Sequence, residues 1–418
     1  MTAHTLDRRG KLVVLFAAFA GLLFDGMELG IMPIASLSVT KSLLGSAFDD
    51  RIAGLWFARF TAALMLGAAV GGIGFGALGD RIGRTKAMGA SILIYSIFAG
   101  MGAFVDSLEQ MFVLRFLVGL GVGGMWPNGV ALVAECWPEA SRPTVAGIVG
   151  AGINVGILGL SQVARVVPIT PDSWRLLFGW SAAPALLGIL TLRFVPESPR
   201  WLASRRESLE AERLPTPPIA ELFRPPLLGT TLLGILLGAI PLIGAWASSK
   251  WMIPWADAVA GPSDPGYKAA AQGWWAAGAA LGAFFGARLA GALGRRPSYA
   301  LISIGSAVAT CGLFLLDRPL SATFLAAVFA QGFVTTLFFG WLPLYLPELF
   351  PTHARATGTG TAYNAGRFAT AFGVFFSGSL VNIFGGDYAS IGAATGTIYA
   401  LGAVVIAFVG PTRPKSLD

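Results

Sequence analysis

Two acidic residues lie inside the first long apolar stretch of the chain, residues 12–40. Asp25 and Glu28 are three residues apart, so on a helix they share one face. If the stretch crosses a membrane, Asp25 lies past the middle of a hydrocarbon core about 30 Å thick. Two close carboxylates in a low dielectric resist double ionisation, so one of them is expected to bind and release a proton. The alternative is a buried acidic pair neutralised by Arg59 or Arg115.

A single arginine, Arg367, lies about eleven residues into a later apolar stretch, 356–383. A fixed cation at that depth can hold a carboxylate through two parallel hydrogen bonds. Arg367 is therefore a candidate binding residue for an organic anion. The alternative is an ion pair with Asp25 or Glu28 across the two halves of the chain.

Further polar and aromatic residues lie within apolar stretches. Arg115 lies in the apolar stretch 109–135, where it could pack against an acid of the first stretch. The deeper aromatic residues could stack on a ring or simply pack, and some of the polar ones should line a cavity. These candidates for a binding site are Trp126, Trp341, Tyr363, Asn128, Asn154, Gln331 and Asn364.

The composition excludes several classes of protein. Of 418 residues, 55% are hydrophobic and only 12% are charged, whereas soluble chains carry about a quarter charged residues. A water-soluble enzyme, a disordered protein and a nucleic-acid-binding domain are therefore excluded. The net charge of +7 fits the Lys and Arg surplus of cytoplasmic loops. Only Cys136, Cys311, His4 and His353 could serve as thiol or imidazole ligands, so we expect no metal centre and no cofactor.

About twelve stretches are long and apolar enough to cross a bilayer. They are 12–40, 54–78, 87–104, 109–135, 143–167, 175–195, 227–249, 270–292, 298–316, 320–346, 356–383 and 389–411. With the amino terminus inside, 17 of the 29 Lys and Arg residues fall in cytoplasmic segments and 7 in external ones. We predict an all-α, multi-pass membrane protein with both termini cytoplasmic, in a bacterial inner membrane or a plasma membrane.

An internal repeat divides the chain. Residues 135–147 and 348–360 both read E-x-x-P-x-x-x-R-x-T-x-x-G, at an offset of 213 residues. Parallel repeats of six spans are typical of two-lobed secondary transporters with a substrate site between the lobes. The predicted domains are an amino-terminal lobe 1–195, a cytoplasmic linker 196–226 and a carboxy-terminal lobe 227–418. For the linker a solvated connector is favoured over a basic amphipathic helix on the inner leaflet.

Charged residues cluster at the predicted cytoplasmic ends of the spans. Residues 76–86 read G-A-L-G-D-R-I-G-R-T-K, and the matching place, 291–296, lacks the aspartate. We expect these charges to form pairs between helices that hold the outward-open state and break on inward opening. The expected gating residues are Asp80, Arg81, Arg84, Glu135, Arg142, Glu348 and Arg355.

With these motifs the chain resembles the major facilitator superfamily. The carriers of the resemblance are residues 76–86, Arg115, P-E-S-P-R at 196–200 and the repeated elements. Asp25-Gly-Met-Glu28 and residues 115–135 are similar to the aromatic acid/proton symporters, although that branch has Asp where Glu28 stands. Sugar porters share P-E-S-P-R, but their closing P-E-T-K-G is absent.

The resemblance implies proton-coupled symport of a small organic anion, with aromatic carboxylates leading, by a protein that functions as a monomer in the lipid bilayer. Asp25, Glu28 and Arg115 would couple the proton. One alternative is a carrier of a neutral or cationic metabolite, such as a sugar or an organic cation, bound directly by the acids of the first span. Another is a non-transporting membrane sensor. No feature of the sequence supports catalysis.

Overall fold

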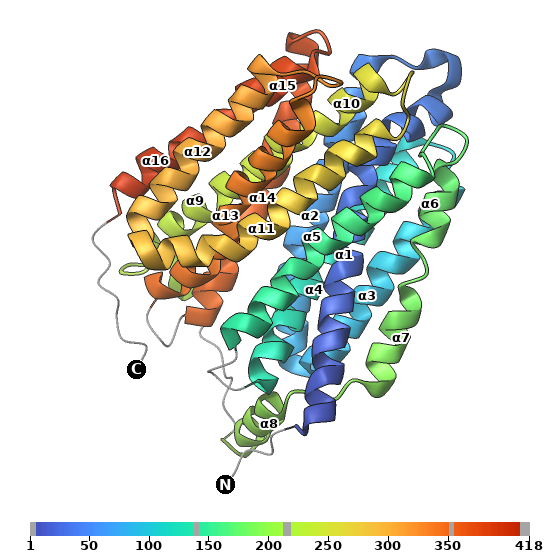
Figure 1. Cartoon of the computed structure of the whole chain (residues 1–418). Coiled ribbons are helices and arrows are strands. Elements are labelled where there is room, and N and C mark those ends of the chain that lie inside the picture. Colours follow the sequence, from blue (N-terminus) through green and yellow to red (C-terminus); the bar gives the residue numbers. More distant parts are fainter. Residues whose placement is uncertain (1–5, 138–141, 212–218, 351–354, 410–418) are drawn as a thin grey trace. The chain divides into compact units, whose positions relative to one another are not determined.

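The chain folds almost wholly into helices. The computed structural model describes residues 6–137, 142–211, 219–350 and 355–409 (Figure 1). Within these residues there is no strand, and eleven helical segments are long and apolar enough to cross a membrane. The remaining predicted span, 356–383, corresponds to α14 (Arg355–Ile383), which is 29 residues long. The predicted all-α membrane architecture is therefore confirmed.

The helices of the first half follow the predicted spans to within a few residues. They are α1 (Arg8–Leu44), α2 (Asp50–Ile82), α3 (Arg84–Met101), α4 (Leu108–Cys136), α5 (Arg142–Val166), α6 (Trp174–Trp180) and α7 (Ala185–Phe194). The predicted span 175–195 is divided between α6 and α7. Pro184 immediately precedes α7 and lacks the N–H that would continue α6 through the turn.

The helices of the second half are likewise close to the predicted spans, with two spans each divided into two helices. They are α9 (Leu228–Ile243), α10 (Met252–Ala260), α11 (Tyr267–Leu293), α12 (Arg295–Leu316), α13 (Phe324–Leu349), α14, α15 (Tyr388–Gly396) and α16 (Ile398–Ala407).

The predicted span 227–249 ends too early. The apolar helical segment runs from Leu228 to Ala260 and changes its winding in the middle. A π-helical turn, η5 (Gly244–Ser248), and a 3₁₀ turn, η6 (Ser249–Trp251), separate α9 from α10. Pro254 in the first turn of α10 has no N–H to donate back to the carbonyl of Lys250, which favours irregular winding there.

The first part of the predicted linker is a helix, α8 (Pro199–Ala211), rather than an extended connector. Its start has a local cause, because the Ser198 hydroxyl accepts a hydrogen bond from the Trp201 N–H at 3.1 Å. Pro199 occupies the first helical position, where its missing N–H costs nothing. A short 3₁₀ turn, η4 (Ile219–Phe223), precedes α9.

The chain divides by its internal contacts into two compact units. Unit 1 consists of Met1–Leu29, Ala63–Ile157 and Trp174–Thr216. Unit 2 consists of Gly30–Ala62, Leu158–Ser173 and Pro217–Asp418. Helices α1, α2 and α5 therefore each contribute one part to each unit. The predicted lobes 1–195 and 227–418 are a different division and stay a prediction.

Glycines allow α11 and α13 of unit 2 to lie side by side. Gly278, Gly282 and Gly286 recur every fourth residue of α11, and each faces a main-chain carbonyl of α13. A Cβ at any of the three would collide with that carbonyl, so the spacing of the two helices depends on glycine. Such close packing of small residues is typical of helices within membranes.

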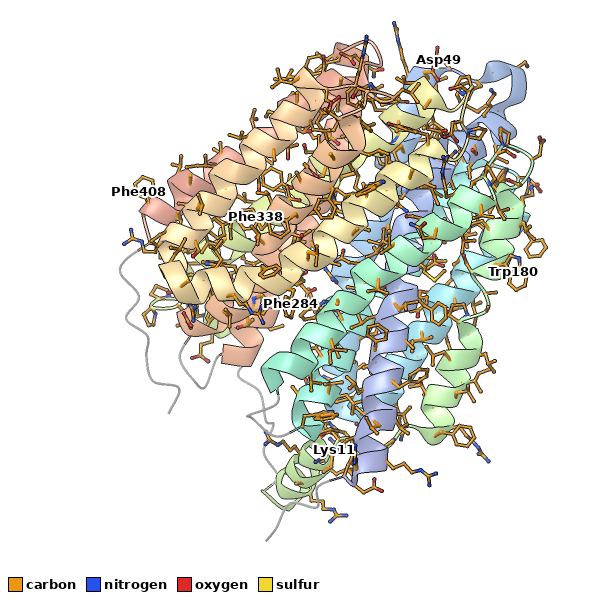
Figure 2. The ribbon with its side chains drawn as sticks, viewed as in Figure 1. Lys11, Asp49, Trp180, Phe284, Phe338 and Phe408 are labelled. Carbon is orange, nitrogen blue, oxygen red and sulfur yellow. The ribbon has the colours of Figure 1, made fainter. Side chains whose placement is uncertain are left out.

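Large apolar side chains also cover the outside of the helices. Trp180 at the end of α6 is 70% exposed, and Phe408 after α16 is 85% exposed. Figure 2 shows both directed away from their helices, whereas Phe338 lies among the helices of unit 2. Exposed aromatic surface of this kind is suited to contact with lipid.

Candidate functional site

Glu28 and Arg115 form an ion pair inside unit 1. Their side chains come from α1 and α4, and Arg115 Nη1 lies 3.5 Å from Glu28 Oε2. Glu28 is 2% exposed and Arg115 is fully buried. The guanidinium carbon lies 5.2 Å from the centre of the Phe178 ring. Among the described residues none forms a hydrogen bond with the guanidinium nitrogens, so the cation depends on the charge of Glu28 rather than on hydrogen-bond acceptors.

Asp25 is buried one helical turn before Glu28, as its position in the first stretch predicts. Gly26, between the two acids, lies directly against the main chain of Ile153 in α5. On another side of α1, the Tyr95 hydroxyl of α3 donates a hydrogen bond to the Gly21 carbonyl at 3.2 Å. The segment that carries both carboxylates is therefore held tightly by its neighbours in unit 1.

Arg367 is half-buried on α14 in unit 2 and lies beside an aromatic ring. Its guanidinium carbon is 5.3 Å from the centre of the Tyr363 ring, one turn earlier on the same helix. The structure thus brings together two of the predicted binding residues. Asn364, on the same helix, donates a hydrogen bond to the Gly360 carbonyl at 3.0 Å.

Three other predicted binding residues have side chains engaged in the interior. Gln331 accepts a hydrogen bond from Trp275 Nε1 at 2.9 Å. Trp341 is fully buried and donates from Nε1 to the Arg295 carbonyl at 2.8 Å. Asn128 donates to the main-chain carbonyls of Phe75 and Gly124, at 2.9 and 2.8 Å. Most of these bonds connect neighbouring helices.

Two further predicted binding residues, Trp126 on α4 and Asn154 on α5, are half-buried.

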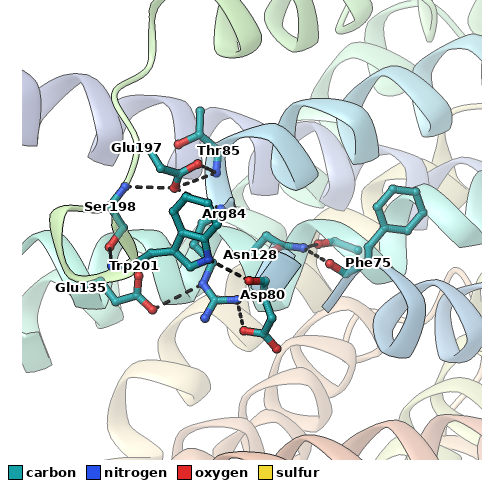
Figure 3. Close-up of polar contacts among 10 residues, drawn as sticks. Phe75, Asp80, Arg84, Thr85, Asn128, Glu135, Glu197, Ser198 and Trp201 are labelled. Atoms are coloured by element: carbon teal, nitrogen blue, oxygen red, sulfur yellow. Dashed lines mark hydrogen bonds and ion pairs between the residues drawn. The ribbon is translucent and has the colours of Figure 1, made fainter. Parts of the chain in front are cut away.

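A charged cluster joins the end of α2, the start of α3 and the end of α4 (Figure 3). Arg84 Nη1 lies 2.5 Å from Asp80 Oδ1, and Arg84 Nε lies 3.4 Å from Glu135 Oε1. Three of the predicted gating residues therefore meet in unit 1. Arg81 is exposed beside them.

Glu197 completes this cluster, and sequence reasoning missed its role. Its carboxylate accepts hydrogen bonds from the main-chain N–H groups of Arg84 at 3.0 Å, Thr85 at 3.2 Å and Ser198 at 2.9 Å. A carboxylate at the start of a helix satisfies free N–H groups and complements the helix dipole. The signal in the sequence is the P-E-S-P-R motif itself, because Glu197 is its only acidic residue.

The α2–α3 turn leaves room for that carboxylate because its connecting residue is glycine. Gly83 has a φ of 113°, and a Cβ there would collide with Glu197. Trp201 of α8 adds a further connection, with Nε1 donating to the Asp80 carbonyl at 2.9 Å. The start of the linker is thus bound to the charged cluster.

Unit 2 contains the equivalent ion pair at the start of α12. Arg295 Nη2 lies 2.7 Å from Glu348 Oε1, and Arg295 Nε donates to the same carboxylate. Gly294, with a φ of 86°, occupies the place that Gly83 has in unit 1. The arginine–glutamate pair is therefore present although the second half lacks the aspartate. Arg295 is a partner that the sequence analysis did not identify.

Some predicted gating residues cannot be placed by their contacts. Arg142 and Arg355 begin α5 and α14, but their side chains lie outside the described residues. The turns of the repeated motif, 138–141 and 351–354, are also outside the described ranges.

Two buried lysines of unit 2 were not predicted as functional. Lys268 Nζ lies 2.8 Å from Asp257 Oδ2 and 3.2 Å from Ser38 Oγ. Lys250 is 1% exposed and lies between indole rings. The predicted span stopped at residue 249, which placed Lys250 in a loop. A lysine within a mainly apolar segment is the signal in the sequence that points to it.

Comparison with known families gives matches over both halves of the chain. The family model described as "Sugar (and other) transporter" matches residues 13–216. The model described as "Major Facilitator Superfamily" matches residues 253–418.

Curated relatives extend over most of the chain. A cis,cis-muconate transport protein of Acinetobacter baylyi is 32% identical over 364 residues, which cover 86% of this chain and 85% of the relative. A probable 4-methylmuconolactone transporter of Cupriavidus pinatubonensis is 31% identical, with 73% and 70% of the two chains covered. The crystal structure of a D-xylose–proton symporter has the same fold, with a TM-score of 0.75 at 19% identity and 97% and 99% of the two chains covered.

Proposed function

The chain belongs to the major facilitator superfamily of membrane transporters, and on that basis we propose that it carries a small organic carboxylate together with a proton. It is a transporter and not an enzyme. The observation that carries the choice of an anion is Arg367, a half-buried cation beside the Tyr363 ring on an apolar helix. A planar guanidinium suits a carboxylate, and the ring suits an apolar body attached to it. The names of the muconate and methylmuconolactone transporters support the same class of substrate.

Proton coupling is assigned to Asp25, Glu28 and Arg115. Arg115 Nη1 lies 3.5 Å from Glu28 Oε2, and no described residue forms a hydrogen bond with the guanidinium. Protonation of Glu28 would weaken its ion pair with Arg115. Deprotonation of Glu28 would restore the ion pair. Movement of α1 against α4 could thus follow the protonation state. Asp25, one turn away, would deliver or share the proton.

In this proposal the protein transports its substrate by alternating access. The substrate site would lie between two six-helix lobes, with both termini cytoplasmic, and the protein would function as a monomer. The pairs Arg84–Glu135 and Arg295–Glu348 would hold helix ends together in one state and separate in the other. Their equivalence in the two halves supports a shared gating role.

The test of the function is uptake into proteoliposomes with an imposed pH gradient. Labelled benzoate, cis,cis-muconate, short monocarboxylates, sugars and organic cations form the panel. We expect concentrative uptake of a carboxylate that requires an inwardly directed proton gradient. Uptake of a sugar or a cation without any carboxylate uptake would favour the carrier of neutral or cationic metabolites instead.

Replacement of Arg367 by Lys tests the carboxylate contact directly. Lysine keeps the charge but cannot form two parallel hydrogen bonds, and each charge-assisted bond contributes about 1.5–3 kcal/mol. Affinity for benzoate should fall about tenfold to a hundredfold, whereas affinity for benzamide should change little. Binding of both ligands to wild type and variant measures this.

Arg288→Lys is the matched control. The Arg288 guanidinium carbon lies 4.4 Å from the centre of the Phe284 ring in the same unit, and Arg288 has no assigned role in binding. Equal discrimination between benzoate and benzamide by wild type and Arg367→Lys would show that Arg367 does not hold the carboxylate.

A further inference from the structure

Lys250 is a buried lysine without a counter-charge among the described residues of unit 2. Its side chain is 1% exposed, and no described residue accepts a hydrogen bond from Nζ. Nζ lies 3.4 Å from the centre of the Trp275 ring and 5.5 Å from that of Trp246. Aromatic faces stabilise an ammonium group but do not replace hydrogen-bond acceptors.

The second buried lysine of the same unit shows what a structural lysine looks like here. Lys268 has a carboxylate partner, Asp257, at 2.8 Å and a hydroxyl partner, Ser38, at 3.2 Å. Buried charges that serve only the fold are normally paired in this way. Lys250 lacks both kinds of partner within the part of the chain that the structure describes.

The polar groups around Lys250 bond to one another. Gln331 accepts from Trp275 Nε1 at 2.9 Å and donates to Ser249 Oγ at 2.5 Å and Thr310 Oγ1 at 3.0 Å. Ser249 is also 3.3 Å from the Tyr399 hydroxyl. This network fixes the plane of the Trp275 indole beneath the amine. The surroundings are therefore well ordered, while the amine has no acceptor among the described residues.

The main chain at Lys250 is wound irregularly. The residue lies in η6, directly after the π-helical turn η5, within the mainly apolar segment from Leu228 to Ala260. It is ten residues before Ala260, where this segment ends. Irregular winding inside a membrane span is tolerated where it is buried in protein or borders a cavity. Single π-helical turns are frequent at functional sites.

From these observations we propose that Lys250 is a carboxylate-binding residue of the transport site, in addition to Arg367. The carboxylate of the substrate accepts the hydrogen bonds from Lys250 Nζ that no described residue accepts. The indoles of Trp246 and Trp275 give the amine apolar neighbours, so the site selects a carboxylate attached to an apolar, flat body. The η5–η6 turn allows the segment to rewind and present the amine to the ligand. This inference rests on the proposed function, because it names a second contact for the same class of substrate.

Lys250→Met is the decisive variant, since methionine keeps the unbranched apolar chain and removes the charge. Affinity for benzoate and for cis,cis-muconate should fall about tenfold or more, whereas affinity for benzamide should remain within about twofold. Binding is measured on the purified full chain by calorimetry and by the fluorescence of the flanking tryptophans. Lys250→Arg should keep most of the affinity for the carboxylates.

Lys41→Met is the matched control, because Lys41 also lies beside an aromatic ring but is exposed. Lys41 Nζ is 5.9 Å from the centre of the Phe48 ring. It should bind all ligands as wild type does. The melting temperature without ligand separates a binding role from a structural one. Lys250→Met should melt no lower than wild type, because it removes a buried charge that lacks a counter-ion.

The outcomes distinguish this inference from the proposed function. If wild type takes up carboxylates but Lys250→Met discriminates benzoate from benzamide as wild type does, the inference is wrong and the function stands. The inference is also wrong, with the function intact, if the variant melts lower and loses both ligands equally. If wild type binds benzoate through Lys250 without any uptake, the anion site stands and the function is wrong. If no carboxylate binds or is taken up, both are wrong.

Discussion

The partner of Glu28 illustrates what single residues reveal before a structure is known. The sequence places two acids within the first span and leaves Arg59 and Arg115 as equal partners. In the structure Arg115 lies 3.5 Å from Glu28, whereas the Arg59 guanidinium lies over the Trp56 ring of its own helix at 4.8 Å. The depth of a residue along its helix can be counted from the sequence. The rotation of one helix against another depends on side-chain packing, so it cannot be counted in the same way.

Replacement of Asp25 by Asn should abolish uptake driven by a proton gradient while the protein remains folded. An amide keeps the shape of the carboxyl group but cannot bind and release a proton near neutral pH. Gradient-driven uptake and the melting temperature are the two measurements. Asp106→Asn is the control, because the Asp106 side chain is 88% exposed. Full concentrative uptake by Asp25→Asn would remove Asp25 from the coupling role.

Replacement of Glu28 by Gln should destabilise the protein by about 3–5 kcal/mol, because it removes the counter-charge that lies against the buried Arg115. The double variant Glu28→Gln/Arg115→Met should recover most of that loss. A double-mutant cycle of unfolding in detergent gives the coupling between the two residues. Additive losses in the cycle would mean that the 3.5 Å contact contributes nothing to stability.

Most spans are predicted to within a few residues, but only some of the interactions that set their boundaries can be recognised in the local sequence. The start of α8 follows from Ser198 and Pro199, which are adjacent in the sequence and could have been recognised there. The start of α3 depends on Glu197, which is 113 residues from Arg84. No local pattern around residue 84 indicates that a carboxylate from the linker caps this helix. The bulge at 244–251 likewise interrupts a stretch whose composition predicts one plain helix.

Replacement of Glu197 by Gln should lower stability by about 1–2 kcal/mol. Gln keeps an oxygen that can accept one hydrogen bond, but it loses the charge that complements the α3 dipole and the charge-assisted bonds to Arg84 and Thr85. Thermal unfolding of the purified protein measures the change. Glu109→Gln in the first turn of α4 is the control, since Glu109 is exposed. Equal effects of the two changes would contradict the capping role.

At the scale of the whole molecule, the repeat was the most informative feature of the sequence. An offset of 213 residues links Glu135 to Glu348, and the structure gives each glutamate an arginine at the start of the helix that follows the glycine turn. The turn after the eighth predicted span lacks the aspartate, but the pair between Arg295 and Glu348 needs no aspartate. Contacts between segments of the two halves, such as Lys268 with Ser38, leave no periodic trace in the sequence and could not be predicted.

Within unit 2, a charged pair also connects residues from the two halves of the chain. Arg165 Nη1 donates hydrogen bonds to both carboxylate oxygens of Asp264, at 2.5 and 2.7 Å. These hydrogen bonds hold the pKa of Asp264 below its usual range. Because the pKa of Asp264 is lower in the folded chain than in the unfolded chain, the pair stabilises the fold at pH values above the usual pKa range of Asp. This stabilisation is lost as the pH falls through the lowered pKa.

Acid unfolding should therefore differ between wild type and Asp264→Asn. At pH values above the usual pKa range of Asp, wild type should be more stable than Asp264→Asn by at most about 1 kcal/mol, because the pair is partly exposed to water. The difference should vanish at a pH below the depressed pKa. Unfolding curves over a series of pH values measure it, with Arg165→Gln expected to behave as Asp264→Asn does. A constant difference at all pH values would contradict the assignment to this carboxyl group.

The distance in sequence between Glu197 and the helix it caps has a consequence for biosynthesis. A ribosome adds about 5–20 residues per second, so the carboxylate emerges about 6–23 seconds after Arg84. Until then the first N–H groups of α3 lack their acceptor, although α3 itself is complete. The turn between α2 and α3 therefore reaches its final form only when the sixth predicted span has been translated. Newly made unit 1 should pass through an early period in which this turn is open to proteases, and a chain that ends before residue 197 should never leave it.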